Sequence, residues 1–387
     1  MYRSPLRVLH VVRRLHYGGL ERVVSEMLQR ADRAAFDNHV LTLIPPGRFG
    51  AGLEAFATLH QAPPMSKASN FWPAALAREI RAIGPDIVHT HSGVWHKVSL
   101  AARIAGVPIV VYTEHGRQVP DPWIVRKMDW MASRMTDVVI AVSEAVARVL
   151  KERVVSYPER VVVIPNGVDA RQFAPTAEDG RLRAELGVSS DTPIIGSIGR
   201  FMQVKGYDVA IAAYQVLRRE WPGGTPPILV LAGDGPERAR LEALSEQLEV
   251  RSNVRFLGFR DDLASILSAF TIFTMSSHSE GTSVSLLEAM SAGLCPVVTD
   301  VGGNAAVLGS ALKHRLVPPA DPTALARAWM DALQKENRRR ADAQVARESV
   351  ARNHSIESTV AAYSRLYQEQ AARRHAGAMS HEQSNGP

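Results

Sequence analysis

The sequence of 387 residues contains a single cysteine, Cys295, and no long apolar run. One cysteine excludes an intrachain disulfide and a zinc site with four cysteine ligands, and it favours a reducing, cytoplasmic setting. A membrane-spanning helix needs about 18 consecutive apolar residues, and no segment approaches that length. Residues 1–19 carry scattered arginines and lack the apolar centre of a signal peptide. We therefore expect a cytoplasmic protein that is soluble or lies on a membrane surface.

Charge is distributed unevenly between the two halves. Residues 1–170 hold 21 Lys and Arg against 15 Asp and Glu, and the remaining residues hold 24 of each, so the first half carries the whole excess of +6. A basic half can attract anionic lipid, phosphorylated acceptors or nucleic acid. An arginine-rich composition with no ligand behind it is the alternative. Nucleic acid is disfavoured as a partner, because the chain lacks basic clusters interleaved with aromatic residues and any known nucleic-acid module.

Short β-branched runs alternate with amphipathic helical windows along most of the chain. This pattern is typical of parallel sheets with helices on both faces. The expected strands are 6–12, 38–43, 87–90, 109–113, 138–142 and 161–164, then 194–198, 228–232, 254–257, 272–275, 296–299 and 315–317. The expected helices include 20–31, 72–83, 143–151, 208–220 and 237–247. The length and a turn-rich segment at 165–169 predict two doubly wound α/β domains that join near residue 170.

Residues 279–290 are the most informative stretch, because they place Glu280 and Glu288 eight residues apart across a loop and a helix start. Thr282 or Ser283 suits the N-cap of that helix. Glu280 then lies in the loop and Glu288 about one turn inside the helix. The two acids can take the hydroxyls of a sugar and of a ribose, with a diphosphate between them on the helix N-terminus. An ordinary capped helix with an exposed glutamate before it explains the segment equally well.

Other residues suited to phosphate binding follow other expected strands, at the edge where the carboxyl ends of parallel strands meet. Gly18 and Gly19 stand between the first strand and a helix, where backbone amides can approach a phosphate. Arg200 and Lys205 follow the first strand of the second half and suit two cations that neutralise a leaving diphosphate. Gly233 begins a tight-turn loop after the next strand. Each feature alone is equally well an ordinary turn, and their joint occurrence favours a nucleotide site.

Histidines gather after two strands of the first half. His115 follows the expected strand 109–113, and His89, His91 and His96 lie around the end of the preceding strand. An imidazole at this edge can hydrogen-bond a sugar hydroxyl or a phosphate, or handle a proton near neutral pH. Four nearby histidines also suggest a metal, but the His-Glu-x-x-His spacing is missing, so we expect no metal site.

These segments together carry a family resemblance. The chain resembles the retaining glycosyltransferases of family 4 (glycosyl transferases group 1) in the runs GGLERVV, VVYTEHG, VIPNGVD, GSIGRFMQVKG, LVLAGDGPERARLE, NVRFLGF, SEGTSVSLLEAM and VTDVGGN. The resemblance covers roughly residues 6–370 and implies the GT-B architecture, in which two Rossmann-like domains face each other across a cleft. The implied parts are an acceptor-binding domain (1–170), a nucleotide-sugar donor-binding domain (171–354) and a helix that packs back on the N-terminal domain (355–373). Residues 374–387 are expected to be a disordered tail.

The resemblance also implies roles for individual residues. Arg200 and Lys205 match the pair that binds the diphosphate, Glu288 the ribose ligand, and Glu280 the acid that contacts the donor sugar. His115 matches the histidine close to the reacting sugar, and it completes the implied catalytic set with Glu280, Arg200 and Lys205. Further donor-binding positions are those of the glycine loop, the base and the amides before the helix: Gly18, Gly19, Gly233, Gly258, Phe259, Gly281, Thr282, Ser283 and Val284.

The implied reaction transfers a sugar from a UDP-, GDP- or ADP-sugar with retention of anomeric configuration. The acceptor hydroxyl attacks from the face that the diphosphate leaves, and a departing phosphate oxygen takes its proton. No metal or other cofactor is expected, because cationic side chains and a helix dipole replace the metal. A nonhydrolysing sugar-nucleotide epimerase, which shares the fold and the substrate class, is the alternative function. A phosphorylase is disfavoured, because the chain shows no convincing lysine site for pyridoxal phosphate.

Two motif variants bear on the pathway. Gly281 is followed by Thr-Ser-Val where many relatives have Phe-Gly or Phe-Pro, so the surroundings of the amide loop are more polar. The Glu-His-Gly-Arg motif at 114–117 resembles that of bacterial exopolysaccharide and lipopolysaccharide transferases. It predicts a glycan or lipid-linked acceptor at the inner face of the cytoplasmic membrane. Residues 123–134 combine tryptophan and methionine with arginine and lysine, which suits a helix lying on an anionic membrane surface. A core-packed helix is the alternative.

Overall fold

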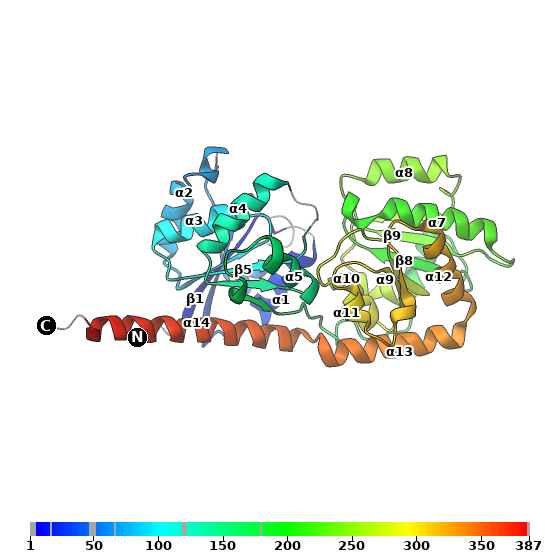
Figure 1. The fold of residues 1–387 in the computed structure, drawn as a ribbon. Coiled ribbons are helices and arrows are strands. Elements are labelled where there is room, and N and C mark those ends of the chain that lie inside the picture. Colours follow the sequence, from blue (N-terminus) through cyan, green and yellow to red (C-terminus); the bar gives the residue numbers. More distant parts are fainter. Residues whose placement is uncertain are drawn as a thin grey trace. The chain divides into compact units, whose positions relative to one another are not determined.

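The computed structural model describes residues 5–15, 18–45, 52–65, 67–117, 122–178 and 180–384. For residues 67, 68 and 377–384 it describes the backbone but not the side chains. Contacts divide the chain into two compact units. The N-terminal unit comprises Met1–Pro165 and Glu357–Pro387, and the C-terminal unit comprises Asn166–Ile356. Each unit is a parallel sheet with helices packed against it (Figure 1).

The sheet of the N-terminal unit has seven strands in the order β3-β2-β1-β4-β5-β6-β7. These are β1 (Leu6–Val12), β2 (Phe36–Thr42), β3 (Thr58–Gln61), β4 (Ile87–His91), β5 (Ile109–Glu114), β6 (Val138–Ala141) and β7 (Val161–Val163). The order reverses between β1 and β4, and ligands of doubly wound sheets bind at such a reversal. The expected strands omit β3, because it is short, half polar and exposed at both ends.

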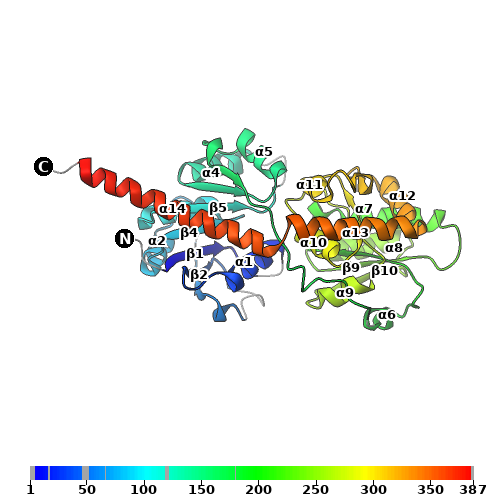
Figure 2. The same cartoon turned by 90° about the horizontal axis from the view of Figure 1, so that it is seen from below.

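Helices and short 3-10 turns connect these strands. They are α1 (Gly19–Arg30), η2 (Leu53–Ala55), η3 (Lys67–Asn70), α2 (Ala74–Ile83), α3 (Trp95–Ala105), α4 (Trp123–Arg134), α5 (Glu144–Arg153) and η4 (Pro158–Arg160). Helix α14 (Ile356–Ser384) returns to this unit and crosses its strands (Figure 2). It continues beyond the expected end at 373, because residues 371–378 are rich in Ala and Arg, which favour helix. Residues 385–387 of the expected tail lie outside the described residues.

The sheet of the C-terminal unit has six strands in the order β10-β9-β8-β11-β12-β13. These are β8 (Ile194–Ile198), β9 (Ile228–Ala232), β10 (Val254–Gly258), β11 (Ile272–Met275), β12 (Cys295–Thr299) and β13 (Leu316–Val317). Its helices and turns are α6 (Arg181–Leu186), η5 (Gln203–Lys205), α7 (Tyr207–Glu220), α8 (Arg238–Gln247), α9 (Leu263–Ala269), α10 (Val284–Ser291), α11 (Asn304–Leu308), η6 (Lys313–Arg315), α12 (Pro322–Gln334) and α13 (Glu336–Asn353). The order reverses between β8 and β11.

Apolar side chains cover both faces of this second sheet. Ile194 and Val230 belong to one core cluster, whereas their neighbours Ile195 and Leu229 belong to the other. Successive side chains of a strand point to opposite faces, so burial on both faces produces the continuous apolar runs seen in the sequence. Strands β8, β9 and β11 accordingly coincide with the expected segments.

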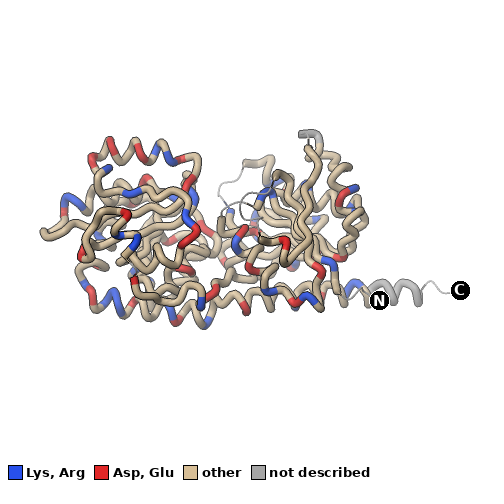
Figure 3. Tube along the Cα trace, turned by 180° about the vertical axis from the view of Figure 1, so that it is seen from behind, with Lys and Arg blue, Asp and Glu red and all other residues tan. Residues whose placement is uncertain are grey.

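The surface is mixed in charge and carries exposed apolar side chains. Figure 3 shows Lys and Arg interspersed with Asp and Glu over the helices of both units. Among the described residues, no helix combines the length and the apolar character that crossing a membrane requires. Large apolar side chains are nevertheless exposed in the N-terminal unit, at Phe71, Trp72, Trp123, Ile124 and Trp130.

Candidate functional site

Three loops meet at the carboxyl edge of the C-terminal sheet, where the strand order reverses. They are the β8 loop (199–206), the β11 loop (276–283), which leads into α10, and the β12 loop (300–303). Backbone hydrogen bonds join them: His278 N donates to the Val204 carbonyl (2.8 Å), and Gly303 N donates to the Gly281 carbonyl (2.9 Å). The β11 loop is therefore held between its two neighbours.

Two glycines permit this close approach. Gly206 has a φ of +59°, and a Cβ there would lie 2.2 Å from the carbonyl oxygen of Ser276. Gly302 has a φ of +56°, and its Cβ would lie 1.8 Å from the carbonyl oxygen of Glu280. Both the backbone conformation and the available space exclude a side chain at either position.

Lys205 and Glu280 contact each other at this junction. The Lys205 Nζ donates to Glu280 Oε1 at 2.7 Å and to Oε2 at 2.9 Å. Ser277 Oγ also donates to Oε1, at 2.5 Å. The Glu280 side chain is only 6% exposed and that of Lys205 is 27% exposed. The two opposite charges therefore neutralise each other where they are largely shielded from water. The sequence placed both residues at strand ends, but it gave no signal that they pair, because they lie 75 residues apart.

Arg200 differs from Lys205 in having no partner. Its side chain is exposed and forms no ion pair or hydrogen bond within the part of the chain that the structure describes. Gly233 follows the neighbouring strand β9, and a Cβ on it would lie 1.9 Å from the Gly199 carbonyl. Gly233 N donates to the carbonyl of Gly258, after which Phe259 follows. The structure thus brings the Arg200 loop, Gly233 and Gly258 together along one edge.

Helix α10 begins as the sequence predicts. Ser283 is its N-cap, and its side chain accepts a hydrogen bond from Leu286 N. The loop residues before it are partly held by Asn166, whose Nδ2 donates to the Thr282 carbonyl at 2.8 Å. Glu288 lies in the second turn and is 2% exposed, so the helix aims its side chain into the unit. Gly281, Thr282 and Val284 flank this N-cap.

His115 lies one residue beyond β5 in the N-terminal unit. Its backbone N donates to Ser92 Oγ (2.8 Å), and its Nε2 lies 3.1 Å from His91 Nδ1. Although its side chain is only partly covered, loss of hydration around the ring lowers the pKa of His115 to about 3. The imidazole is therefore neutral at pH 7. Its shielded Nδ1 has no hydrogen-bond partner among the described residues.

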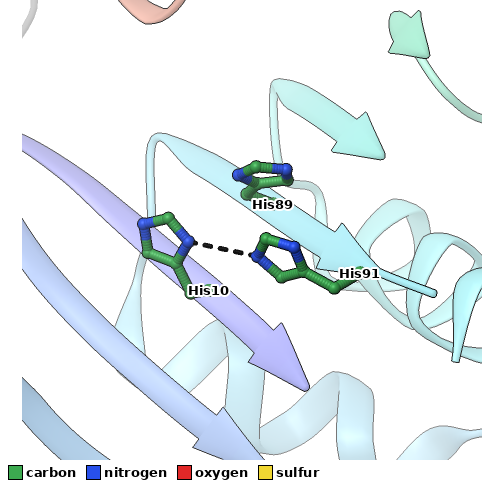
Figure 4. Close-up of side chains that lie close together, drawn as sticks. All are labelled: His10, His89 and His91. Atoms are coloured by element: carbon green, nitrogen blue, oxygen red, sulfur yellow. Dashed lines mark hydrogen bonds between the residues drawn. The ribbon is translucent and has the colours of Figure 1, made fainter. Parts of the chain in front are cut away.

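His10 joins the histidines that the sequence analysis grouped. Ring nitrogens of His10, His89 and His91 lie within 4.8 Å of one another, with His10 on β1 and the others on β4 (Figure 4). This proximity is compatible with a metal site. However, His89 uses Nε2 on Thr113 Oγ1 (2.7 Å) and Nδ1 on the Tyr367 hydroxyl (2.6 Å), and these hydrogen bonds occupy both its nitrogens. No sequence motif marks His10 or Tyr367, and two-residue alternation on β1 is the only signal for His10.

The paired glycines stand at the start of α1. Gly19 is its first residue, and Gly18 is an N-cap without a side-chain hydrogen bond, so the first-turn amides have no side-chain cap. The backbone of Gly18 is extended, and a Cβ there would meet only the end of the Glu21 side chain. Positive φ is thus not the reason for this glycine. His16 and Tyr17, which precede it, lie outside the described residues.

The N-terminal unit also contains a cavity of about 810 Å³, lined by the start of α3, by α4 and by the loops after β1 and β2. Arg117 at its wall is held by Glu114 (3.2 Å) and Asp129 (2.6 Å). Arg13 and Lys97 also line it, and neither forms a side-chain hydrogen bond or ion pair within the described ranges. Loss of hydration lowers the pKa of Lys97. The cavity therefore combines apolar walls with two unpartnered cations that no sequence motif had indicated.

Comparison with known proteins decides the family. Glycosyltransferase Family 4 matches residues 17–172, and Glycosyl transferases group 1 matches residues 178–349, which together cover most of the chain. The chain belongs to these glycosyltransferases. The resemblance noted in the sequence is thereby confirmed.

Relatives and solved structures agree with this assignment. The glycosyltransferase is 30% identical over 232 residues to the UDP-Gal:alpha-D-GlcNAc-diphosphoundecaprenol alpha-1,3-galactosyltransferase of Escherichia coli, covering 57% of this chain and 59% of that one. It is 28% identical to the N-acetyl-alpha-D-glucosaminyl L-malate synthase of Bacillus anthracis, over 73% and 74% of the two chains.

Anabaena HepE in complex with UDP-glucose superposes with a TM-score of 0.82 at 19% identity, over 94% of this chain and 100% of that one. WaaG, a glycosyltransferase involved in lipopolysaccharide biosynthesis, gives 0.72 at 19% identity, over 93% and 99%. The fold is GT-B.

Proposed function

We propose that this glycosyltransferase moves a sugar, with retention, from a nucleotide-diphosphate sugar to a glycan or lipid-linked acceptor in cell-surface polysaccharide biosynthesis. The contact between Lys205 and Glu280, at the reversal point of the C-terminal sheet, carries the proposal. A cation and an acid held together there suit a donor that has a diphosphate beside a sugar with hydroxyls. The name of the Escherichia coli relative, which specifies a UDP-sugar and a lipid-diphosphate acceptor, supports both substrates.

Lys205 and Arg200 act on the diphosphate in this proposal. An ammonium has three donors, and Glu280 accepts from Lys205 with two oxygens, so a phosphate oxygen can take a further hydrogen bond. Arg200 is exposed and unpartnered in the described structure, and it supplies a second cation. Amides at the start of α10 add a partial positive charge. These groups together take the place of a metal ion.

The proposed reaction is a substitution at the anomeric carbon. The bond from this carbon to the diphosphate oxygen breaks, a bond to the acceptor oxygen forms on the same face, and the departing phosphate takes the acceptor proton. Lys205 and Arg200 stabilise the charge that develops on the leaving diphosphate, an effect worth on the order of 3 kcal/mol per donor in comparable sites. Glu280 orients the sugar through its hydroxyls.

We assign the acceptor to the cavity of the N-terminal unit. Arg13 and Lys97 suit a phosphate-bearing acceptor, and the apolar part of the wall suits a lipid. Residues 123–127 at the start of α4 are all exposed, and they include Trp123, Ile124, Arg126 and Lys127. A helix of this composition suits the surface of an anionic membrane, which agrees with an acceptor held at the inner face of the cytoplasmic membrane.

The role of Glu288 as ribose ligand has a direct test. Calorimetry first identifies which of UDP-, GDP- and ADP-glucose binds, and the Glu288→Gln variant, which keeps the shape of the side chain, is then titrated with the same compound. We expect at least a ten-fold weaker affinity. Ser291→Ala, in the same helix three residues on, is the control and should bind normally. Equal affinity of the Glu288→Gln variant would remove the ribose assignment.

Retention is tested by the anomer formed first. Glycosyltransferases hydrolyse donors slowly in the absence of acceptor, and proton NMR identifies the free sugar before it mutarotates. An α-linked donor should release the α anomer. Release of the β anomer would overturn the retaining assignment and leave the donor assignment intact.

A further inference from the structure

Three histidines of the N-terminal unit form a continuous hydrogen-bonded row, which we call the histidine row: His10, His91 and His115. His10 Nδ1 lies 3.3 Å from His91 Nε2, and His91 Nδ1 lies 3.1 Å from His115 Nε2. Figure 4 shows the first of these contacts, between β1 and β4. The row therefore runs from inside the sheet to its carboxyl edge and ends at the histidine assigned to the reacting sugar.

Strand register brings these side chains to one face. His10 pairs with His89 in the parallel ladder of β1 and β4, so His91, two residues further on, lies on the same face of the sheet. His91 pairs in turn with Thr113 of β5, and His115 follows it by two residues. The row is thus a product of sheet geometry rather than a chance contact of flexible side chains.

Only two arrangements of protons on the ring nitrogens are compatible with the histidine row. Burial lowers the pKa of His10 to about 4 and places that of His91 well below its usual value, and the pKa of His115 is about 3. All three rings are neutral at pH 7, and a neutral imidazole has one donor and one acceptor nitrogen. His91 therefore donates to one neighbour and accepts from the other. Either every ring in the row carries its proton on Nε2, or every ring carries it on Nδ1.

We propose that every ring of the row carries its proton on Nε2, so that His91 and His10 fix His115 with Nδ1 as a hydrogen-bond acceptor for a hydroxyl of the substrate. Neutral histidine in water already favours the Nε2–H form, and in this arrangement each of the three rings has that form. In it, His115 Nε2–H donates to His91 Nδ1, and His91 Nε2–H donates to His10 Nδ1. His91 and His10 are positioning residues, because they act only through His115.

The neighbouring His89 is consistent with the same form. Its Nε2 faces Thr113 Oγ1 and its Nδ1 faces the Tyr367 hydroxyl, which is an O–H donor. Tyr367 belongs to α14, so the C-terminal helix packs directly against the ring beside the row. Burial raises the pKa of Tyr367, and this hydroxyl keeps its proton.

An unprotonated Nδ1 limits the groups that His115 can bind in the substrate, an inference that rests on the proposed function. A shielded acceptor without a partner in the described structure costs free energy, and an incoming O–H group removes that cost. A phosphate diester oxygen of the donor carries no proton at neutral pH and is repelled by the same lone pair. The sugar hydroxyl, and not the diphosphate, is therefore the group that His115 recognises.

The test is nuclear magnetic resonance of the full chain with 15N-labelled histidine at pH 7.5, without donor or acceptor. Long-range proton–nitrogen correlation distinguishes a protonated from an unprotonated ring nitrogen, and loss of signals in His10→Gln, His91→Asn and His115→Gln assigns each ring. We expect protonated Nε2 and unprotonated Nδ1 in all three. Protonated Nδ1 on His115, or two protonated nitrogens, would overturn the proposal. Because no substrate is present, this outcome is independent of the proposed function.

Two variants separate positioning from folding. In His91→Asn the amide oxygen lies near the former Nδ1 and still accepts from His115, so we expect His115 to keep the Nε2–H form. In His91→Leu no acceptor remains, and His115 should show an averaged mixture of both forms. His314, which pairs with Asp342 in the other unit, should be unchanged in both. An unaltered His115 signal in a folded His91→Leu variant would contradict the proposal, and if that variant does not fold, the wild-type spectrum still decides.

Discussion

Arg200 and Lys205 are assigned to the same diphosphate, yet their surroundings differ. Lys205 neutralises Glu280, whose side chain is 6% exposed, whereas Arg200 is exposed and has no partner in the described structure. Removing Lys205 leaves a shielded carboxylate without its cation, which costs about 1–3 kcal/mol of folding free energy. Removing an exposed, unpaired arginine changes stability by no more than about 0.5 kcal/mol.

Substitution of Arg200 and of Lys205 should therefore lower activity to a similar extent but affect stability differently. We expect Arg200→Ala and Lys205→Ala each to lower kcat/KM roughly 100-fold or more. Only Lys205→Ala should lower the melting temperature, by several degrees. Arg219→Ala, an exposed arginine in the last turn of α7, is the control and should change neither quantity. Full activity of Arg200→Ala would remove it from the diphosphate site.

Neutral histidines make stability depend on pH. The pKa of His10 is about 4 and that of His115 about 3, against 6.5 for an unshifted histidine. The unfolded chain therefore binds more protons than the folded one below pH 6.5, and stability is lost as the pH falls from there towards 4. Each proton of difference contributes about 1.4 kcal/mol per pH unit. Burial raises the pKa of Glu114, which acts in the opposite direction.

Urea unfolding of the full chain at pH 7.5, 6.5 and 5.5 checks this expectation. The free energy of unfolding should fall between 6.5 and 5.5, and the fall should be smaller in His91→Asn, which removes one such ring. A free energy that is constant or increases over this interval would show that the histidines are charged in the folded state.

At the scale of single elements, the approach of the β8 and β11 loops depends on Gly206. Gly206→Ala places a Cβ 2.2 Å from the Ser276 carbonyl and should lower stability by more than the roughly 1–2 kcal/mol expected for the left-handed conformation alone. Gly224→Ala is a matched control, because its φ is +77° and nothing lies within 4 Å of the added atom. Equal losses in chemical denaturation would mean that the loop contact contributes nothing.

Helix α4 is the element that we expect to bind the membrane surface. Sedimentation with vesicles of phosphatidylglycerol and phosphatidylcholine at low salt should remove the protein from solution. Replacing Trp123 and Ile124, 68% and 48% exposed, by serine should weaken binding roughly ten-fold or more. Val162→Ser, an exposed apolar position on β7, is the control. Failure of the wild-type chain to bind would refute docking through α4 and leave the transfer reaction unaffected.

The elements differ in how well the sequence predicts them, for physical reasons. Strands such as β8 and β9 are buried on both faces, so they are recognisable in the sequence as apolar runs. Ser283 is recognisable as an N-cap because its side chain accepts a hydrogen bond from a backbone amide of the helix that follows. Strand β3 is short and half polar, and it pairs only because β2 offers an open edge. Local pattern therefore predicts the elements that carry their own signal and misses those that depend on a neighbour.

At the scale of the whole molecule, family motifs predict which residues form the site, and contacts between distant segments define the state of those residues. The motifs place Lys205 and Glu280 at strand ends, and the structure adds that they neutralise each other. His10 has no motif, and only the register of β1 with β4 aligns it with His91. Such pairings result from tertiary packing, which one sequence does not display.

The central claim is that the C-terminal unit holds a nucleotide-diphosphate sugar through Lys205 and Glu288. The most direct measurement is the melting temperature of the wild-type chain with UDP-glucose, UDP-galactose, UDP-N-acetylglucosamine, GDP-mannose and ADP-glucose. A ligand at 100 times its Kd adds about 2.7 kcal/mol of stability. We predict that at least one of these compounds raises the melting temperature by several degrees. The same compound should raise that of Glu288→Gln by roughly half as much or less, because a ten-fold weaker affinity leaves about 1.4 kcal/mol of the stabilisation. No shift with any of them, or an equal shift in the variant, would contradict the account.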